Sequence, residues 1–359
     1  METDNFKSVK NQIVTINELK YNISNFKKIF YIFIILILLL NTLIFSFLFI
    51  RNSIFTNNLQ NNINITYLIE NITSLIENKI NADNNACILV KNKLKNRIQP
   101  FDFEDELMFF IDLISCNIPF SLIRFADGEN SIMKGIKINA KLDKWYWDHK
   151  NKKFQESLIE SASICTNQNS FIGIPCKNWF KISESILSFS KCSTAKFMSY
   201  SSLFVNKNYP VFKDWIIKFI NSSNRSKIIL VANSIINKNI TWAYKFFPVP
   251  DHLVENWDNH SISLLSELSH LAKQNNFIFF ISAGAASKII ISYLTKINSN
   301  NTYIDFGSSI EFITKGYTTR TYAKNGDTSH LSCEPFLLQN KSLIYINQKN
   351  NEKFSKIKN

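Results

Sequence analysis

The stretch FSLIRFADGE, at residues 120–129, joins an apolar run to a short acidic segment. The apolar run follows Pro119 and predicts a buried strand over 120–125. Asp127 and Glu129 come directly after this strand, with Gly128 between them. Glycine lets a loop bend tightly and lets a ligand approach the backbone. The stretch therefore predicts a strand with a tight acidic loop at its carboxyl end.

Strand and helix patterns alternate along the chain on both sides of this stretch. Strands that alternate with helices of about 10–15 residues are typical of a mostly parallel sheet with flanking helices and right-handed crossovers. The sequence therefore predicts an α/β fold. The expected strands are 120–125, 171–174, 227–232, 277–282 and 302–306, and the expected helices are 103–116, 154–164, 262–273 and 285–295.

The acidic loop has the residue types of a cation and phosphate site. Ligands of open parallel sheets bind beyond the carboxyl ends of the strands, which is where this loop is expected. Asp127 and Glu129 can present oxygen atoms to one hard cation such as Mg²⁺ or Mn²⁺. Arg124, just upstream, has the forked guanidinium that suits phosphate. On residue types alone, an ordinary Asp-Gly turn is the alternative.

Two further strand ends carry small or polar residues. Gly284 lies between the strand at 277–282 and the helix at 285–295, where the N–H groups of a helix start could hold phosphate. The full G-x-G-x-x-G pattern is absent, so a tight strand–helix turn explains this segment equally well. Asp305 lies at the end of the strand at 302–306. Its carboxylate could bind a hydroxyl of a ribose or sugar, or it could cap the next segment of the chain.

The N-terminal region contains an uncharged segment at residues 29–50. At a rise of about 1.5 Å per residue, its 22 residues span about 33 Å, enough for the hydrocarbon layer of about 30 Å. The segment is longer than the apolar region of a cleaved signal peptide. Lysines precede it and only Arg51 follows closely, so residues 1–28 are expected in the cytosol. The sequence predicts a type II signal-anchor with the rest of the chain lumenal or extracellular.

Residues 51–98 have the pattern of a helical stem. Isoleucines recur at spacings of 4, 3 and 4 from Ile65 to Ile76, which makes an apolar stripe over two heptads. Such a helix either packs on the domain that follows or associates with a second copy, so a homo-oligomer through the stem is one of two expectations. Residues 99–339 are the expected globular domain, and residues 340–359 are a polar C-terminal tail.

Charge and cysteine content restrict the partners of the expected exported domain. The chain has 41 Lys and Arg against 28 Asp and Glu, a net charge of +13, but no run of five or more basic residues. An exported domain does not meet DNA, so no nucleic-acid partner is expected. The six cysteines would lie in an oxidising space, and the sequence does not choose among their pairings. None forms a C-x-x-C pair, which disfavours structural zinc.

In their order, several segments resemble the glycosyltransferases of the GT-D fold, whose signature is a strand followed by R-F-G-D-G-E. The resemblance covers about residues 100–325. Ala126 departs from the family pattern because it replaces the first glycine, whereas Arg124 and both carboxylates are present. The matching segments are Arg124-Phe125-Ala126-Asp127-Gly128-Glu129, Gly173-Ile174-Pro175, Ile228–Ala232, Ala283-Gly284-Ala285-Ala286-Ser287-Lys288 and Asp305-Phe306-Gly307-Ser308.

The resemblance implies a Rossmann-like glycosyltransferase domain that binds a sugar nucleotide, and the predicted signal-anchor would attach it to a membrane. The enzyme would move a sugar from a nucleoside-diphosphate sugar, with a UDP-sugar as the expected donor, to a glycan or glycoprotein acceptor. Asp127 and Glu129 would hold Mn²⁺ or Mg²⁺ on the diphosphate, and Arg124 would act with them in catalysis. The residues expected to contact the donor are Arg124, Gly128, Gly284, Asp305, Gly307 and Ser308.

A transfer of this kind builds negative charge on the leaving phosphate, and the acceptor hydroxyl needs a general base unless that phosphate takes its proton. Asp251, Glu255 and Asp258 follow the strand at 227–232 and are all candidates for the base. A non-catalytic anchored module that binds glycans or a protein is the alternative function. A nucleotide-dependent phosphotransferase is less favoured, because the Walker motif G-x-x-x-x-G-K-[ST] is absent.

Overall fold

The protein is described by a computed structural model, whose secondary structure covers residues 62–140, 145–166, 169–176, 179–192, 194–222, 227–233, 240–318, 320, 322 and 333. The expected cytosolic tail (1–28), signal-anchor (29–50) and C-terminal tail (340–359) lie outside the described residues. Within the described part of the chain, no helix combines the length and the apolar character that a membrane crossing requires.

The chain divides into two compact units, Met1–Ala82 and Asp83–Asn359. The described part of the first unit is the beginning of α2 (Asn62–Asn96), which confirms a helix within the expected stem. Ile72 and Ile76 of the predicted stripe are exposed on this helix. The association of two stems stays a prediction.

The second unit is built on a seven-stranded sheet in which every neighbouring pair of strands is parallel. This arrangement confirms the expected α/β fold with a parallel sheet. In spatial order the strands are β5 (Met198–Tyr200), β4 (Ser170–Ile174), β1 (Ser121–Arg124), β9 (Thr302–Asp305), β8 (Ile278–Ser282), β6 (Ile228–Asn233) and β7 (Lys245–Val249). A separate antiparallel pair is formed by β2 (Ile138–Ala140) and β3 (Trp145–Trp147).

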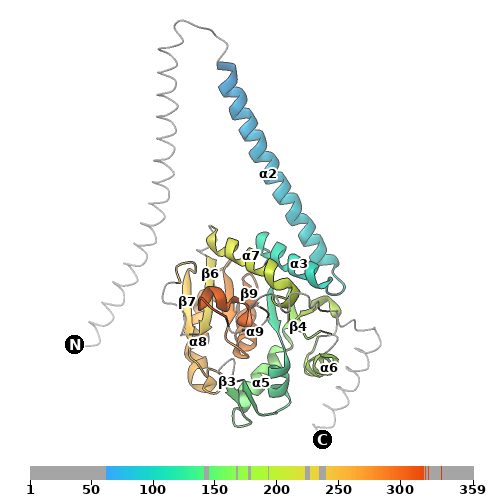
Figure 1. The fold of residues 1–359 in the computed structure, drawn as a ribbon, viewed down its shortest axis with the longest axis vertical. Helices are drawn as coiled ribbons and strands as arrows, with labels where there is room; N and C mark the ends of the chain where they lie inside the picture. The colour runs from blue at the N-terminus through green and yellow to red at the C-terminus, as the bar shows by residue number, and fades with distance from the viewer. Residues whose placement is uncertain are drawn as a thin grey trace, which may run out of the picture. The chain divides into compact units, whose positions relative to one another are not determined.

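Helices cover both faces of the sheet (Figure 1), because alternate residues of each buried strand point to opposite faces. On one face, Leu122 and Ile304 pack in the same apolar cluster as α3 (Phe103–Ser115) and α7 (Tyr209–Asn221). On the other face, Ile123 packs with four further long helices. These are α5 (Lys152–Ser161), α6 (Phe180–Phe189), α8 (Trp257–Ala272) and α9 (Ala286–Ile297), together with the short α4 (Asp127–Met133).

The helices and strands expected from the sequence are present, with small differences at their ends, whereas α6, α7 and several shorter elements were not expected. Helix α8 begins at Trp257 instead of Ile262. Strand β7 was not predicted, because it contains Pro248 and several of its side chains are at least partly exposed. Both features are typical of an edge strand, and β7 lies at one edge of the sheet. Strand β5, at the opposite edge, is only three residues long.

Ion pairing and a disulfide fix the end of α2 to the domain. Cys87 of α2 is bonded to Cys116, which directly follows α3. The guanidinium of Arg97 donates two hydrogen bonds of 2.7 Å to the carboxylate of Glu106, and both side chains are fully buried. From Asp83 onward, α2 belongs to the second compact unit, and the expected boundary at residue 98 stays a prediction.

All six cysteines are paired, which settles the connectivity that the sequence left open. The Cα–Cα distances are 5.2 to 5.7 Å, within the range that a disulfide requires. The pairs are Cys87–Cys116, Cys165–Cys192 and Cys176–Cys333.

The strand order creates a crevice beside β1. From β1 the chain continues to β4 and β5 on one side of the sheet, and later returns through β8 and β9 on the other side. β1 and β9 therefore lie next to each other: β1 connects onward to β4 on one side, and β9 is reached from β8 on the other. Such a switch point is where open parallel sheets bind ligands, beyond the carboxyl ends of the strands.

Candidate functional site

A cleft of about 530 Å³ lies at the carboxyl ends of these strands. Its lining includes every residue that the sequence assigned to catalysis, cation binding or donor binding, which are Arg124, Asp127, Gly128, Glu129, Gly284, Asp305, Gly307 and Ser308. A second hollow, of about 420 Å³, is lined by residues of α5, α8 and α9 and contains none of these residues. The tertiary structure thus brings together three segments that are far apart in the sequence.

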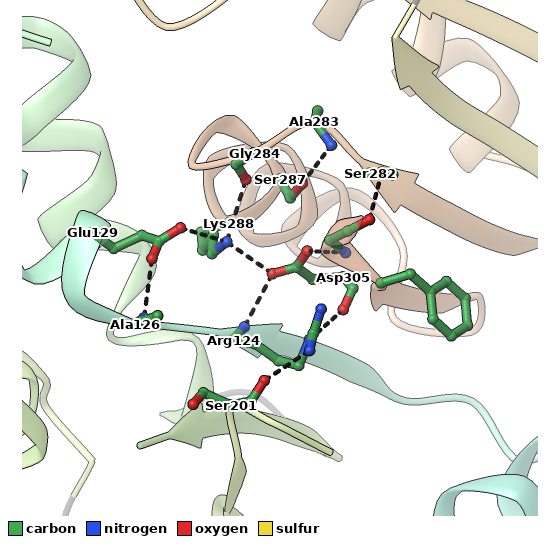
Figure 2. A network of polar contacts seen from close by, with 12 residues as sticks. Arg124, Ala126, Glu129, Ser201, Ser282, Ala283, Gly284, Ser287, Lys288 and Asp305 are labelled. Atoms are coloured by element: carbon green, nitrogen blue, oxygen red, sulfur yellow. Dashed lines mark hydrogen bonds and ion pairs between the residues drawn. The ribbon is translucent and has the colours of Figure 1, made fainter. Parts of the chain in front are cut away.

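A buried ammonium group lies at the base of the cleft. Lys288 Nζ is 2.7 Å from Glu129 Oε1 and 3.0 Å from Asp305 Oδ2, and it also donates to the carbonyl of Gly284 at 3.2 Å. All three charged side chains are at least 90% buried. Figure 2 shows Lys288 between the two carboxylates, which come from the segments after β1 and at the end of β9.

The pKa of Lys288 reflects two opposing effects. Burial alone would lower it, because desolvation disfavours the charged amine, but the charges of Asp305 and Glu129 and their hydrogen bonds raise it above the ordinary lysine value. The ammonium is therefore positively charged at neutral pH.

Arg124 is held in the cleft by main-chain carbonyls. Its Nε donates to the carbonyl of Asp305 at 2.6 Å, and its Nη1 donates to the carbonyl of Ser201 at 2.7 Å. The guanidinium also lies over the ring of Phe204, 5.1 Å from its centre. No carboxylate of the described residues lies within 4.0 Å of the guanidinium nitrogens, so its charge is available to an anion.

Two glycines leave the space that the Arg124 side chain occupies. A Cβ atom on Gly173 would lie 2.9 Å from Arg124 Cγ and 2.8 Å from the carbonyl oxygen of Tyr200. A Cβ atom on Gly307 would lie 2.8 Å from Arg124 Nη2. Both glycines belong to segments that the sequence singled out, and the structure shows that Gly307 shapes the cleft through Arg124.

The segment after β1 is a helix, which corrects the expectation of a tight acidic loop. Helix α4 begins at Asp127, and Glu129 Oε2 accepts a hydrogen bond from the backbone N–H of Ala126 at 3.0 Å. Acidic side chains in the first turn favour a helix start, which is why this sequence does not form a turn. Ala126 has an extended backbone, φ −133°, so alanine replaces glycine there without strain.

The two carboxylates of the predicted cation pair have different environments. Asp127 is exposed at the cleft, whereas Glu129 is buried and both of its oxygens already have partners, Lys288 and the Ala126 N–H. Asp127 can therefore bind a divalent cation. Glu129 can be a second ligand only if its carboxylate contacts the cation and Lys288 at the same time. The shared cation stays a prediction.

The end of β9 is tightly bonded. Asp305 is fully buried, and besides Lys288 it accepts hydrogen bonds from the backbone N–H of Gly307 at 3.1 Å and of Arg124 at 3.3 Å. Its carboxylate thus accepts hydrogen bonds from backbone N–H groups, which is the role described by the capping alternative. Ser308 Oγ is 2.8 Å from the hydroxyl of Tyr322, whose pKa is raised by burial.

The structure separates the three candidates for the general base. Asp251 lines the cleft and accepts a short hydrogen bond from Asn233. Glu255 contacts His252, which lines the cleft. Asp258 lies at the second hollow, on α8.

Sequence reasoning missed His252 and Lys288 as parts of the site. Lys288 was visible as the end of the matched Ala283–Lys288 segment, but its role depends on contacts with residues far away in the sequence. His252 lies next to a considered carboxylate, Asp251, and its position on the cleft wall was not visible in the pattern.

No protein-family model matches this chain, and no curated protein sequence matches it. The solved structures that resemble it include one described as showing that "the highly conserved domain of unknown function 1792 has a distinct glycosyltransferase fold". That structure is 16% identical to this chain in sequence, with a TM-score of 0.39. The match covers 67% of this chain and 93% of the chain in that structure. A selenomethionine-substituted structure of the same domain has 15% identity and a TM-score of 0.39, covering 71% and 96%. A likeness of this extent does not establish what this chain binds.

Proposed function

We propose that the protein is a glycosyltransferase that uses a nucleoside-diphosphate sugar, with a UDP-sugar as the expected donor. The observation that carries this proposal is the Arg124 guanidinium, which has no carboxylate partner among the described residues and lies in a cleft at the switch point of a parallel sheet. An unpaired, preorganised guanidinium suits a diphosphate because its forked donors match phosphate oxygens.

The chemistry follows from where charge develops. When the bond between the anomeric carbon and the diphosphate breaks, negative charge accumulates on the leaving phosphate oxygen. Donors that are already in place stabilise that charge without reorganising. Arg124 is fixed by two carbonyls, and Gly307 and Ser308 lie beside it on the cleft wall, so these residues are placed to bind and orient the diphosphate.

The proposal includes a divalent cation, Mn²⁺ or Mg²⁺, with Asp127 as its ligand. When bound, it would neutralise charge on the diphosphate. Asp127 supplies an exposed carboxylate at the cleft, and Glu129 is the second predicted ligand. Lys288 Nζ lies 2.7 Å from Glu129 Oε1 and so holds this carboxylate in place.

The cellular setting is also part of the proposal. We infer an anchor at residues 29–50, a lumenal or extracellular domain and a glycan or glycoprotein acceptor. Three disulfides within the described domain support an oxidising compartment, because such bonds persist there and are rare in the cytosol.

Calorimetric titration of the purified full-length chain with UDP, with and without Mn²⁺ or Mg²⁺, tests this function. We expect UDP to bind in the presence of the cation, and Asp127→Ala to remove the effect of the cation. Asp83→Ala is the matched control, because Asp83 is exposed on α2 outside the cleft. Arg124→Ala is expected to weaken UDP binding about 10- to 100-fold, as for the loss of hydrogen bonds to a charged group. If no nucleoside diphosphate binds, the alternative of a non-catalytic glycan- or protein-binding module replaces the enzyme.

A further inference from the structure

His252, which lines the candidate cleft, forms a pair with Glu255. They lie in the segment between the end of β7, at Val249, and the start of α8, at Trp257. His252 Nδ1 is 3.0 Å from Glu255 Oε1. The imidazole is 58% exposed and lines the same cleft as Arg124 and Asp127.

The contact with Glu255 determines which ring nitrogen is free. A carboxylate accepts hydrogen bonds and does not donate them, so Nδ1 carries the proton in this contact. A neutral imidazole with its proton on Nδ1 has a lone pair on Nε2. An exposed imidazole in this form can take a proton from a bound hydroxyl group.

Glu255 is more buried than an ordinary surface ion-pair partner. Its side chain is only 21% exposed, and its second oxygen, Oε2, is buried without a hydrogen-bond partner among the described residues. The contact with His252 is therefore a major compensation for burying this carboxylate. A base oriented by a carboxylate on its other nitrogen is the arrangement that activates nucleophiles in many enzymes.

The backbone holds His252 in an uncommon conformation. Its φ angle is +61°, in the left-handed region that non-glycine residues adopt at a cost of about 1 kcal/mol or more. Its carbonyl accepts hydrogen bonds from the backbone N–H and the side-chain amide of Asn256, at 3.1 and 3.3 Å. Uncommon backbone conformations of this kind cluster at functional sites.

We propose that His252 is the general base of the transfer and that Glu255 is the residue that positions it. This inference rests on the proposed function and names a base that is not among the three carboxylates considered from the sequence. The acceptor O–H gives its proton to His252 Nε2 while the acceptor oxygen bonds to the anomeric carbon. The bond from that carbon to the diphosphate oxygen breaks, and its electron pair stays on the leaving phosphate. The imidazolium then releases the proton to solvent.

A separate base has a stereochemical consequence. If the leaving phosphate took the proton, the acceptor would attack from the side of the leaving group. A protein base instead activates an acceptor on the opposite face of the sugar, as in inverting glycosidases, so the configuration at the anomeric carbon is inverted.

Donor hydrolysis tests the proposal, because water can replace the unidentified acceptor. UDP-glucose, UDP-galactose and UDP-N-acetylglucosamine are incubated with the full-length chain, and released UDP and the first-formed sugar anomer are measured. We expect His252→Gln to lower the rate of UDP release about 100-fold or more, with UDP affinity unchanged within about twofold. His260→Gln is the matched control, since His260 is exposed on α8 and does not line the cleft.

Glu255 is tested as a positioning residue by comparing kcat with KM. Glu255→Gln is expected to lower kcat about tenfold with little change in KM, and Glu255→Asp to restore part of the loss, because a carboxylate again faces Nδ1. Wild-type rates in His252→Gln, or a retained anomer, would overturn this inference while leaving the glycosyltransferase proposal intact. No release from any donor by the wild-type chain would overturn both.

Discussion

Lys288 Nζ lies 2.7 Å from Glu129 Oε1, a contact that joins α9, the helix after β8, to α4, the helix after β1. Since Lys288 also pairs with Asp305, one ammonium connects the helices after β1 and β8 with the last residue of β9. The cleft is therefore built on a buried ion-pair group, and its shape depends on those charges remaining paired.

Replacing Lys288 by methionine should destabilise the domain strongly. The substitution keeps an apolar stem but leaves two buried carboxylates without their cation, a loss of about 3–5 kcal/mol in the free energy of unfolding. Urea denaturation measures it. Adding Glu129→Gln to this variant should recover part of the loss, because one of the unpaired charges is then removed.

Lys296→Met is the control for the removal of a lysine. Lys296 pairs with Glu160, but both side chains are more than half exposed, so the expected change is within about 0.5 kcal/mol. Equal effects of the two substitutions would contradict the central role of Lys288.

Gly307→Ala and Gly316→Ala should separate backbone strain from the position of Arg124. Both glycines have positive φ, +51° and +77°, so alanine costs about 1 kcal/mol or more of stability at either position. Only at Gly307 does the added Cβ meet Arg124, whereas at Gly316 it meets nothing within 4 Å. We expect UDP affinity to fall about tenfold in Gly307→Ala alone.

Calorimetry with UDP and urea denaturation measure the two effects on the same protein samples. Similar losses of stability with unequal losses of affinity support the role of Arg124. Equal affinities in the two variants would show that the diphosphate does not depend on the guanidinium.

The disulfides should differ in their effect on stability. Cys176–Cys333 spans 157 residues of sequence and Cys165–Cys192 spans 27. On the chain-entropy account, the longer loop restricts the unfolded chain more, by about 1.5 kcal/mol. Paired serine substitutions, with denaturation measured at equal protein concentration, should therefore show the larger loss for Cys176 and Cys333. The reverse order would show that packing outweighs chain entropy here.

Alkaline pH should destabilise the domain through buried groups. The pKa of Lys288 is raised by its carboxylates, and burial raises the pKa of Tyr209 to about 12 and the pKa values of Tyr303 and Tyr322 above their usual range. The unfolded chain releases these protons from about pH 10 onward, while the folded chain still holds them. The contribution of these groups to the free energy of unfolding is therefore fully present below about pH 10 and is lost as pH rises further.

Tyr303→Phe tests this expectation, since Tyr303 is fully buried in the core. Removing one such group should reduce the slope of stability against pH above pH 10 by up to about 1.4 kcal/mol per pH unit. Urea denaturation between pH 8 and pH 11 measures the slope. An unchanged slope would mean that this tyrosine does not contribute to alkaline unfolding.

The local pattern of the chain was sufficient for much of this architecture. The apolar run at 120–125 predicted β1, and the alternation of strands and helices predicted a parallel sheet, because hydrophobic periodicity depends only on neighbours in the sequence. The same argument located the strand ends at Arg124, Gly284 and Asp305, which line the cleft.

The cysteine pairing, the strand order and the bonding within the cleft were decided only by the tertiary structure. Glu129 was predicted as a cation ligand from its spacing to Asp127, yet it pairs with Lys288, which comes from a distant helix. His252 and Glu255 are close in the sequence, but the place of His252 on the cleft wall depends on β7 joining the edge of the sheet. Periodicity fixes which face of an element is buried, whereas the choice of neighbouring strand is made by the packing of the whole core.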